Sequence, residues 1–266
     1  MERPRGVQAA WGPRVAEEDH RVGSSQQTTL RHAVSCTGVG LHSGARVAMT
    51  LKPAAANTGI VFRRTDIEGE AAFIPARFDL VASVAYGTTL KNEDGVEIRT
   101  VEHLMSALAG CHIDNAFVEI DGIEVPIMDG SAAPFVFLID CAGTRMLEEP
   151  RRVIRILKDV EIRDGDKRVR LSPHDGFAVE CEIEFADAAI SRQKFEIDLT
   201  GAAFKNEVSR ARTFIQRKEI EALQANGLAK GGSLANAIVV DEGAVLNGDG
   251  LRYRDEFVRH KALDVI

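Results

Sequence analysis

The fold is decided by the stretch Thr100-Val-Glu-His-Leu-Met-Ser-Ala-Leu-Ala-Gly110. Its pattern predicts a helix over residues 101–109, which begins after Thr100 and can end at Gly110. Strand patterns lie on both sides: residues 83–91 and 96–99 flank the hairpin signal Asp94-Gly95, and residues 115–121 and 124–127 flank Asp121-Gly122.

The same order of strands and helix returns along the chain. Further strands are predicted over residues 29–36, 45–52 and 59–64, and a second helix over residues 131–141. Residues 148–152 are the best linker candidate. After them we expect strands over 152–160, 167–172, 177–185, 195–198 and 237–240, and helices over 205–211, 215–225 and 255–266. This order indicates an α+β fold with a duplicated unit, although the letters show no fixed-period repeat. The expected parts are a flexible N-terminal extension over residues 1–27, a first α+β domain over 28–149 and a second over 150–266.

Composition limits the class of protein. The 266 residues are 45 % hydrophobic and 27 % charged, as expected for one large or two ordinary soluble domains. The net charge of −7, the single Trp and the two Tyr argue against a nucleic-acid surface. The four cysteines form no Cys-x-x-Cys pair, so we expect isolated buried thiols in a reducing compartment. No apolar run reaches the ~18 residues of a membrane span, and residues 1–27 lack the apolar core of a secretory signal, so the cytoplasm is expected.

A metal site is predicted from the last expected helix. His260 and Asp264 are four residues apart and share one helical face, so both can reach one ion. His103, far upstream, is the third candidate ligand. Two histidines and one aspartate leave an open position for water, as catalytic zinc requires. The spacing alone also fits a surface histidine paired with an aspartate.

Glu102 precedes His103, and neighbours on a helix point about 100° apart. Glu102 can therefore stay free when His103 binds a metal, and can take a proton from water as a general base. A solvated acid in the first helical turn is the other interpretation. Residues 37–44 lack the Rossmann glycine spacing, residues 230–233 do not form a Walker A loop, and no Gly-x-Ser-x-Gly elbow is present.

Six blocks carry a family resemblance. They are Thr37-Gly-Val-Gly-Leu-His-Ser-Gly44, Thr100-Val-Glu-His-Leu104, Pro126-Ile-Met-Asp-Gly-Ser-Ala-Ala-Pro-Phe135, Ser209-Arg-Ala-Arg-Thr-Phe214, Gly231-Gly-Ser233 and Asp255-Glu-Phe-Val-Arg-His-Lys-Ala-Leu-Asp264. From about Thr28 to the last residue, the chain resembles the UDP-3-O-acyl-N-acetylglucosamine deacetylases, zinc amidases of bacterial lipid A synthesis. The resemblance implies two α+β domains that form a sandwich, with helices packed between the sheets.

The resemblance also implies roles for single residues. His103, His260 and Asp264 match zinc ligands, although Fe²⁺ can occupy similar sites. Glu102 matches the general base, Thr213 a group that holds the water and the substrate carbonyl, and Lys261 an active-site lysine near the sugar-phosphate side. The apolar passage for the substrate's acyl chain is matched by Phe214, Ile220, Ala229, Gly232, Ser233, Ala237 and Val239. The implied partner is a UDP-sugar lipid, and the implied state is a monomer.

Two departures from the family pattern stand out. Ile215 follows Thr213-Phe214 where the family often has glycine. The sequence stops at Ile266, whereas the family continues with further strands and a catalytic histidine in a Ser-Gly-His segment. The general-acid histidine is therefore expected beyond Ile266, and the second domain is expected to be incomplete at its C-terminus. Loss of such a group costs on the order of 10²–10³ in rate by analogy with oxyanion-hole donors.

Two other functions stay open at this point. The first is a weakly active or inactive fragment that binds only zinc or substrate, which the end at Ile266 favours. The second is a zinc peptidase, which the missing His-Glu-x-x-His pattern disfavours.

Overall fold

The computed structural model describes residues 25–266, in which helices and several separate sheets are mixed. The α-helices are α1 (Glu102–Gly110), α2 (Ala133–Ala142), α3 (Gly201–Ala203), α4 (Arg217–Ala225) and α5 (Glu256–Val265). A π-helical turn, η3 (Phe204–Val208), continues α3, and short 3-10 helices cover Glu70–Ala72 and Phe78–Leu80. The predicted flexible extension falls largely on residues 1–24, outside the described part of the chain.

The first half of the chain builds a five-stranded sheet of order β2-β3-β9-β4-β5. Its members are β2 (Val34–Val39), β3 (Arg46–Pro53), β4 (Ile60–Arg64), β5 (Phe73–Pro75) and β9 (Ala116–Ile120). Strand β9 is central, antiparallel to β3 and parallel to β4. Beside it lie the pair β1 (Gln26–Leu30) with β10 (Thr144–Pro150) and the small sheet of β6 (Val81–Ser83), β7 (Thr89–Lys91) and β8 (Glu97–Ile98).

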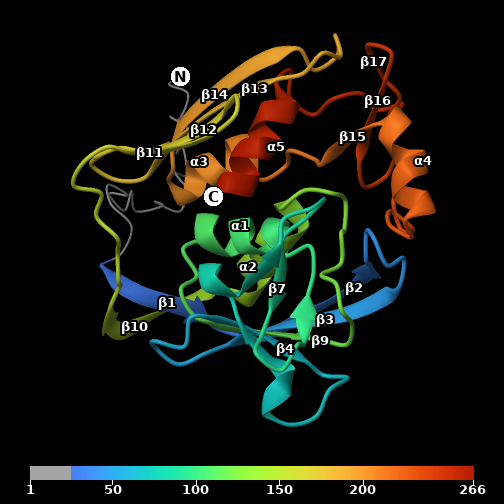
Figure 1. Cartoon of the computed structure of the whole chain (residues 1–266). Coiled ribbons are helices and arrows are strands. Elements are labelled where there is room, and N and C mark those ends of the chain that lie inside the picture. Colours follow the sequence, from blue (N-terminus) through green and yellow to red (C-terminus); the bar gives the residue numbers. More distant parts are fainter. Residues whose placement is uncertain (1–24) are drawn as a thin grey trace, which may run out of the picture.

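The second half of the chain forms smaller sheets. Two are antiparallel pairs, β11 (Val160–Asp164) with β12 (Lys167–Leu171) and β13 (Ala178–Glu184) with β14 (Arg192–Asp198). A third contains β15 (Phe214–Gln216), β16 (Ile238–Asp241) and β17 (Ala244–Val245). Helix α5 lies beside β13 and β14, and α4 lies beside the third sheet (Figure 1).

Helices α1 and α2 lie between the five-stranded sheet and the layer that contains α5 (Figure 1). One hydrophobic cluster joins these layers, because it includes Phe62 of β4, Leu104 of α1, Phe135 of α2 and Val258 of α5, all fully buried. The predicted α+β class is confirmed. The main core therefore lies around α1, the helix that carries Glu102 and His103.

Gly110 lets two layers approach closely. A Cβ atom at this position would lie 2.2 Å from the ring of Phe204, which is fully buried in η3. The phenyl ring therefore packs directly against the last turn of α1. This contact fixes the distance between α1 and the segment that leads to residues 209–214.

Several predicted strands have different bounds. The strand expected over 29–36 is wrong, because the chain bends at Arg31 and Ser35 belongs to β2, while Gln26 already belongs to β1. The strand expected over 83–91 is divided between β6 and β7. Residues 152–159 form no strand, and residues 215–216 belong to β15 rather than to the helix after it. Residues 148–150 end β10, which pairs with β1, so they are not a free linker.

The last predicted helix is confirmed with shorter bounds. It was expected over residues 255–266, and α5 ends at Val265, one residue before Ile266. The Ile266 N–H still donates to Ala262 O at 3.2 Å, and its half-buried side chain packs against the main core. Ile266 thus extends the packing of α5 without belonging to the helix.

The hairpin expected at Asp121-Gly122 is also wrong. Strand β9 is enclosed by β3 and β4, which use both of its edges. The residues after it pair elsewhere: the Arg99 N–H donates to Ile123 O (2.8 Å), and the Val125 N–H donates to Arg99 O (3.0 Å). The hairpin signal at Asp94-Gly95 is confirmed by the pair β7–β8, and β11 likewise pairs with β12 across the turn at Gly165. All four cysteines are free thiols, but the expected burial is wrong: Cys141 is exposed, and Cys36, Cys111 and Cys181 are only half-buried.

The hairpin of β11 and β12 packs little against the rest of the described chain. Its apolar residues face each other across the strands in the pairs Val160–Leu171 and Ile162–Val169. All four are exposed, with Ile162 at 71 % and Val169 at 68 % of their full accessibility.

Within residues 25–266, no helix is both long and apolar enough to cross a membrane.

We predict that Phe204→Ala lowers the free energy of unfolding by about 3–5 kcal/mol, because it leaves a cavity where the phenyl ring packs between two layers. Urea titration followed by circular dichroism measures this loss. Phe78→Ala is the matched control, since Phe78 is 92 % exposed and its removal should change stability by less than about 0.5 kcal/mol. Equal losses for both variants would contradict this interpretation of the packing.

Candidate metal centre

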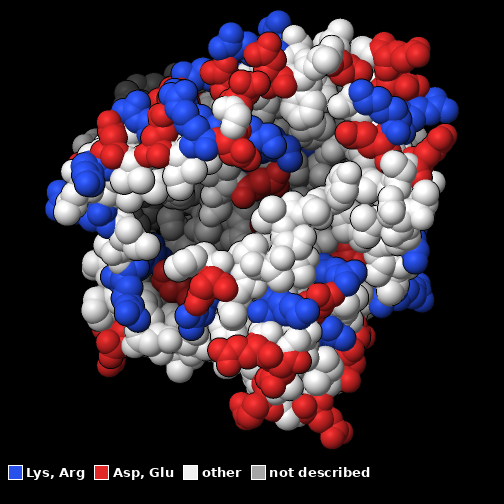
Figure 2. Space-filling model, in the orientation of Figure 1, with Lys and Arg blue, Asp and Glu red and all other residues white. Residues whose placement is uncertain are grey.

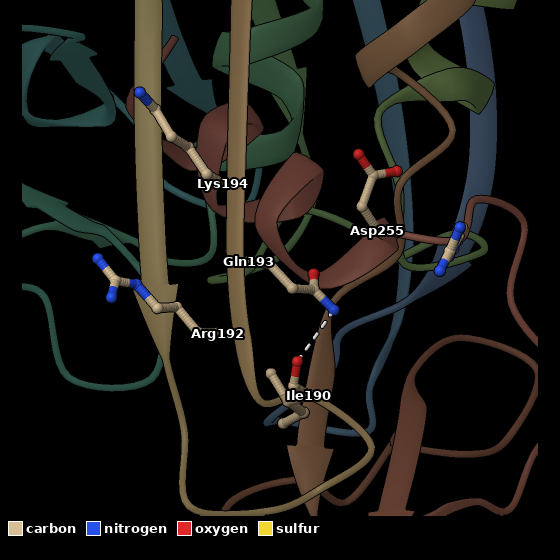
Figure 3. A pocket seen from close by; sticks show the side chains of 6 residues that line it. Ile190, Arg192, Gln193, Lys194 and Asp255 are labelled. Atoms are coloured by element: carbon tan, nitrogen blue, oxygen red, sulfur yellow. Dashed lines mark hydrogen bonds between the residues drawn. The ribbon is translucent and has the colours of Figure 1, made fainter.

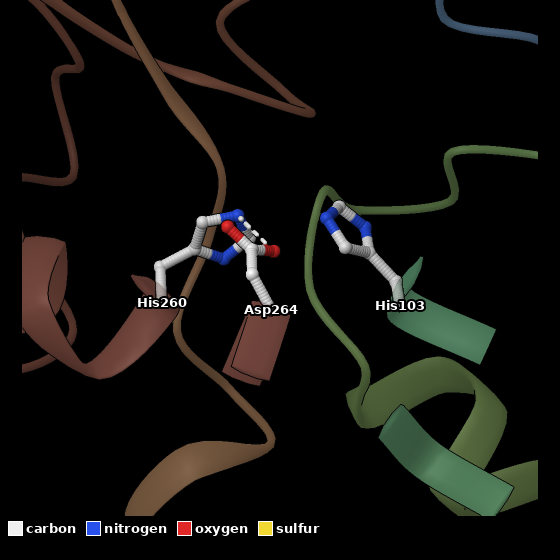
Figure 4. Close-up of side chains that lie close together, drawn as sticks. All are labelled: His103, His260 and Asp264. Carbon is white, nitrogen blue, oxygen red and sulfur yellow. Dashed lines mark ion pairs between the residues drawn. The ribbon is translucent and has the colours of Figure 1, made fainter. Parts of the chain in front are cut away.

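Two helices from distant parts of the chain bring three possible metal ligands together. His103 comes from α1, and His260 and Asp264 come from α5 (Figure 4). One ligand atom from each residue lies within 4.8 Å of the other two. The two imidazole rings meet edge to face with centroids 5.0 Å apart, and His260 Nε2 lies 3.5 Å from Asp264 Oδ1. The structure thus brings together the three residues that the sequence selects as ligands.

The proton of His260 is positioned by the backbone. Its Nδ1 lies 3.0 Å from the carbonyl oxygen of Ala211, which can only accept, so Nδ1 carries the hydrogen. In the neutral ring, Nε2 then keeps its lone pair on the side of Asp264. An imidazole held by a carbonyl at one nitrogen and free at the other has the usual arrangement of a metal-ligating histidine.

The electrostatics of the three groups favour a cation. Burial, reinforced by the nearby His260, lowers the pKa of His103 to about 4, and burial also lowers the pKa of His260. Burial acts to raise the pKa of Asp264, but His260 and Lys261 outweigh it and hold this pKa below its ordinary value. At neutral pH the group therefore contains two neutral imidazoles and one carboxylate, the protonation state that metal binding requires.

A buried atom without a partner supports the same fit. His103 is 3 % exposed, and its Nδ1 has no hydrogen-bond partner in the described chain. A buried polar atom in this condition costs free energy unless something satisfies it. Two imidazoles and one carboxylate form a donor set typical of catalytic zinc, so the residues present fit a zinc ion.

Glu102 stands next to this group at the start of α1. The backbone N–H of Thr88 donates to its Oε2 at 2.9 Å, and a Cβ atom at Gly87 would lie 3.2 Å from its Oε1. The missing side chain at position 87 leaves room at the carboxylate. The negative charge of Glu102 also acts on His103, where it opposes the effect of burial. Glu102 is thus held by one backbone hydrogen bond beside the three candidate ligands.

The segment before β15 borders the same place. The Phe214 ring lies 6.4 Å from the His260 ring and 5.3 Å from the ammonium nitrogen of Lys261. Lys261 Nζ also pairs with Asp264 Oδ2 at 2.9 Å. Thr213 is held by two backbone hydrogen bonds of 2.8 Å each: its N–H donates to Gly130 O, and its carbonyl oxygen accepts the Ile238 N–H.

The other residues matched to the acyl passage gather around the third sheet. Ile220 lies on α4, Val239 on β16, and Ala229, Gly232, Ser233 and Ala237 in the connection between them. This connection touches the loop at residues 40–42: a Cβ at Gly231 would lie 2.2 Å from Gly40 O, and the Ala229 N–H donates to His42 Nδ1 at 3.4 Å. Of the seven predicted passage residues, Phe214 is the one with a ring contact to the metal group.

Ile266 contributes an apolar contact after the last turn of α5. Ile266 lies two residues after Asp264, but its side chain is apolar and packs against the main core, so Ile266 has no catalytic part. The general-acid histidine that the resemblance places beyond Ile266 is not one of the 266 residues. Its role therefore stays a prediction from the resemblance.

Two cavities lie away from the three ligands. The first, of about 380 Å³, is lined by Ile190, Arg192, Gln193, Lys194, Arg254 and Asp255 (Figure 3). Its cations Arg192 and Lys194 pair with Glu182 and Glu180 of β13. The second, of about 590 Å³, lies between residues 37–39 and 231–236. In the space-filling view, the visible face is hollowed between the layers, and its positive and negative side chains are intermixed (Figure 2).

Sequence reasoning missed a buried ion pair at the start of α5. Arg212 and Glu256 form a buried ion pair, 2.9 Å between Nε and Oε1, with side chains 2 % and 0 % exposed. The acidic first turn of the last helix suggested only a favourable interaction with the helix dipole. Arg212 lies inside the block Ser209–Phe214 and Glu256 inside the block Asp255–Asp264, but neither block shows that the two residues meet.

Comparisons with known proteins agree with this geometry. The family model described as LpxC, UDP-3-O-acyl N-acetylglycosamine deacetylase, matches residues 27–266. The chain belongs to the LpxC family. It is similar to the UDP-3-O-acyl-N-acetylglucosamine deacetylase of Pseudoalteromonas atlantica, with 53 % identity over 243 residues, 91 % of this chain and 80 % of the relative. The protein of the same name from Myxococcus xanthus is 53 % identical over 246 residues, 92 % of this chain and 78 % of that relative. The predicted family, its enzyme class and its function as a deacetylase of lipid A biosynthesis are confirmed.

We predict that the metal-free LpxC chain loses stability as the pH falls from 6.5 towards 4. His103 keeps a pKa near 6.5 in the unfolded chain but about 4 in the folded one, so in this window the unfolded state binds more protons. The loss from His103 alone is on the order of 3 kcal/mol. Urea titrations at pH 7 and pH 4.5, with a chelator present, measure it.

His103→Gln should reduce this pH dependence, because the amide does not titrate. His32→Gln is the control, since His32 is exposed, and it should keep the full dependence. An equal loss of stability for all three proteins would contradict a buried neutral His103.

Proposed function

We propose that this chain hydrolyses the N-acetyl group of UDP-3-O-(3-hydroxyacyl)-N-acetylglucosamine, giving acetate and the free amine, the committed step of lipid A biosynthesis. The observation that carries the proposal is the convergence of His103, His260 and Asp264 beside Glu102. It occurs in a chain about half identical to proteins named for this deacetylation.

The ligands of the metal in this proposal are His103, His260 and Asp264. Zinc, when bound, polarises an amide carbonyl and lowers the pKa of a water molecule to about 7. The protein contributes by keeping both imidazoles neutral and the carboxylate ionised, because of burial and of the neighbouring charges. Fe²⁺ accepts the same kinds of ligand, so the preference for zinc is part of the proposal.

Glu102 is the proposed general base. Its Oε2 accepts the Thr88 N–H, which fixes the direction of the carboxylate, while the missing side chain at Gly87 leaves its Oε1 approachable. In the proposed reaction this carboxylate removes a proton from the attacking water, the water oxygen bonds to the carbonyl carbon, and the C–N bond breaks as the nitrogen gains a proton.

Thr213 and Lys261 are the proposed electrostatic partners of the substrate. The backbone of Thr213 is held on both sides, and its chain neighbours Ala211 and Phe214 contact the His260 ring, which gives its side chain a fixed origin. Lys261 is anchored by Asp264 and lies over the Phe214 ring, so its ammonium group is available beside the metal group for an anionic part of a nucleotide sugar. Groups fixed before the reaction stabilise developing charge without reorganisation.

The acyl chain is proposed to pass along Phe214, Ile220, Ala229, Gly232, Ser233, Ala237 and Val239. The contact of Phe214 with the His260 ring supports this path, since it connects the metal group to the third sheet. Apolar surface there can accept a hydrocarbon chain that extends from the sugar.

The division into domains belongs to the same proposal. Residues 28–149 hold the five-stranded sheet with α1 and α2, and residues 150–266 hold the smaller sheets with α5. The arrangement of α1 and α2 between two layers supports a sandwich of two similar α+β units (Figure 1). We also propose that the protein acts as a monomer in the cytoplasm, where a UDP-linked substrate would be supplied.

We predict that Glu102→Gln retains zinc but lowers the deacetylation rate by about 10²–10⁴, because the amide cannot accept the proton. Acetate release from the UDP-sugar substrate and metal content per chain measure the two effects. Glu97→Gln is the matched control, five residues upstream, where the carboxylate pairs with Arg99. It should keep both properties.

Three outcomes would count against the proposal. Unchanged turnover in Glu102→Gln would remove its assignment as the base. Zinc binding without acetate release by the unsubstituted chain would favour a protein that only binds zinc or substrate. Cleavage in a peptide panel would favour a peptidase.

Chelation followed by reconstitution with Zn²⁺ or Fe²⁺ identifies the metal that restores turnover.

A further inference from the structure

The peptide group between Ala211 and Arg212 forms hydrogen bonds to side chains of α5 through both its carbonyl oxygen and its N–H. Its carbonyl oxygen accepts the hydrogen of His260 Nδ1 at 3.0 Å. Its N–H, which belongs to Arg212, donates to Glu256 Oε1 at 3.0 Å. Glu256 and His260 are four residues apart on α5 and therefore share one face of the helix.

Glu256 is fully buried, and its carboxylate is paired with the guanidinium of Arg212. Its carboxylate accepts Arg212 Nε at 2.9 Å and Arg212 Nη2 at 3.3 Å, as well as the backbone N–H of Arg252. The guanidinium also bonds to Asp249 Oδ2 at 3.0 Å and to Gly250 O. These donors compensate the buried carboxylate, which would be far more costly without them.

We propose that Glu256 is a positioning residue for the metal centre, which it reaches through the Ala211–Arg212 peptide group. The inference rests on the proposed function, because it assumes that His260 binds the metal. In many metal sites a carboxylate accepts the second N–H of a ligating histidine directly. Here the connection has one more step: the Glu256 carboxylate accepts the N–H of the Ala211–Arg212 peptide group, and the carbonyl oxygen of that group accepts the N–H of His260.

Two physical effects follow from this connection. Bonds in a chain polarise one another, so the negative charge on Glu256 makes the Ala211 carbonyl a stronger acceptor and His260 a more basic ligand. The peptide plane, held at both ends, also fixes the ring direction and keeps the hydrogen on Nδ1. Arg212 contributes by holding Glu256 in place, whereas Asp249 touches only the far end of the guanidinium and is itself 66 % exposed.

A purely structural ion pair would behave differently. Its loss would lower the stability of the fold, but the folded fraction would bind metal as before. A positioning role predicts a change in the metal site of the folded protein. The tautomer of His260 in the metal-free chain reports that change directly.

The test uses the full chain with Glu256→Gln, and with Asp249→Asn as the matched control, since both replace an acid on the same arginine by its amide. Zn²⁺ affinity is measured by competition with a chelator at pH 7.5. The protonated nitrogen of His260 is identified by ¹⁵N NMR of the metal-free protein, and circular dichroism confirms folding. We expect Zn²⁺ to bind about 10–100-fold more weakly to Glu256→Gln. Its His260 should become a mixture of tautomers, while Asp249→Asn should match the unsubstituted chain.

Glu256→Asp covers the case in which Glu256→Gln does not fold. It keeps the negative charge for Arg212 but is one methylene shorter, so it should also weaken Zn²⁺ binding. Unchanged affinity and an unchanged tautomer in either folded variant would overturn the inference. If the unsubstituted chain bound no Zn²⁺, the proposed function would fail, and the tautomer in the metal-free protein would still decide this inference.

Discussion

The burial of two neutral imidazole rings at the contact of α1 and α5 is the constraint on which the rest of the site depends. A protein gains little stability from placing His103 and His260 in its core, because their polar nitrogens need partners there. The fold supplies one partner, the Ala211 carbonyl, and leaves His103 Nδ1 without one in the described chain. Such a local cost is typical of a site that is kept for its chemistry rather than for stability.

Buried charges connect the site to the surrounding layers. Glu124, which is fully buried, accepts the backbone N–H groups of His42 and Ser43, each at 2.8 Å, and the Thr100 hydroxyl at 2.9 Å. It thereby joins the loop at residues 40–43 to the start of α1. Glu256 and Arg212 act similarly at the start of α5. Each network has a satisfied carboxylate at its centre, and such networks favour one arrangement of their partners over all others.

Local signals predicted the helices α1, α2 and α5 and the pairing of His260 with Asp264, because helical spacing and capping are properties of neighbouring residues. The errors arose where distant segments decide the structure. The signal at Asp121-Gly122 suits a hairpin, but β3 and β4 occupy both edges of β9. The role of Glu256 depends on Arg212, which lies 44 positions upstream, and nothing in the spacing of either residue shows the contact. That His103 lies beside His260 follows from the fold and not from any local pattern.

The exposed hairpin of β11 and β12 has a consequence for the dynamics of the chain. An isolated two-stranded pair is at best marginally stable in water, and this one adds little burial through its apolar residues. Its backbone amides should therefore exchange with solvent through local opening that leaves the main core intact. In such openings Ile162 and Val169 become part of a free, β-prone edge that can pair with another chain. Self-association at high concentration would then begin at this hairpin rather than at the well-bonded layer around α5.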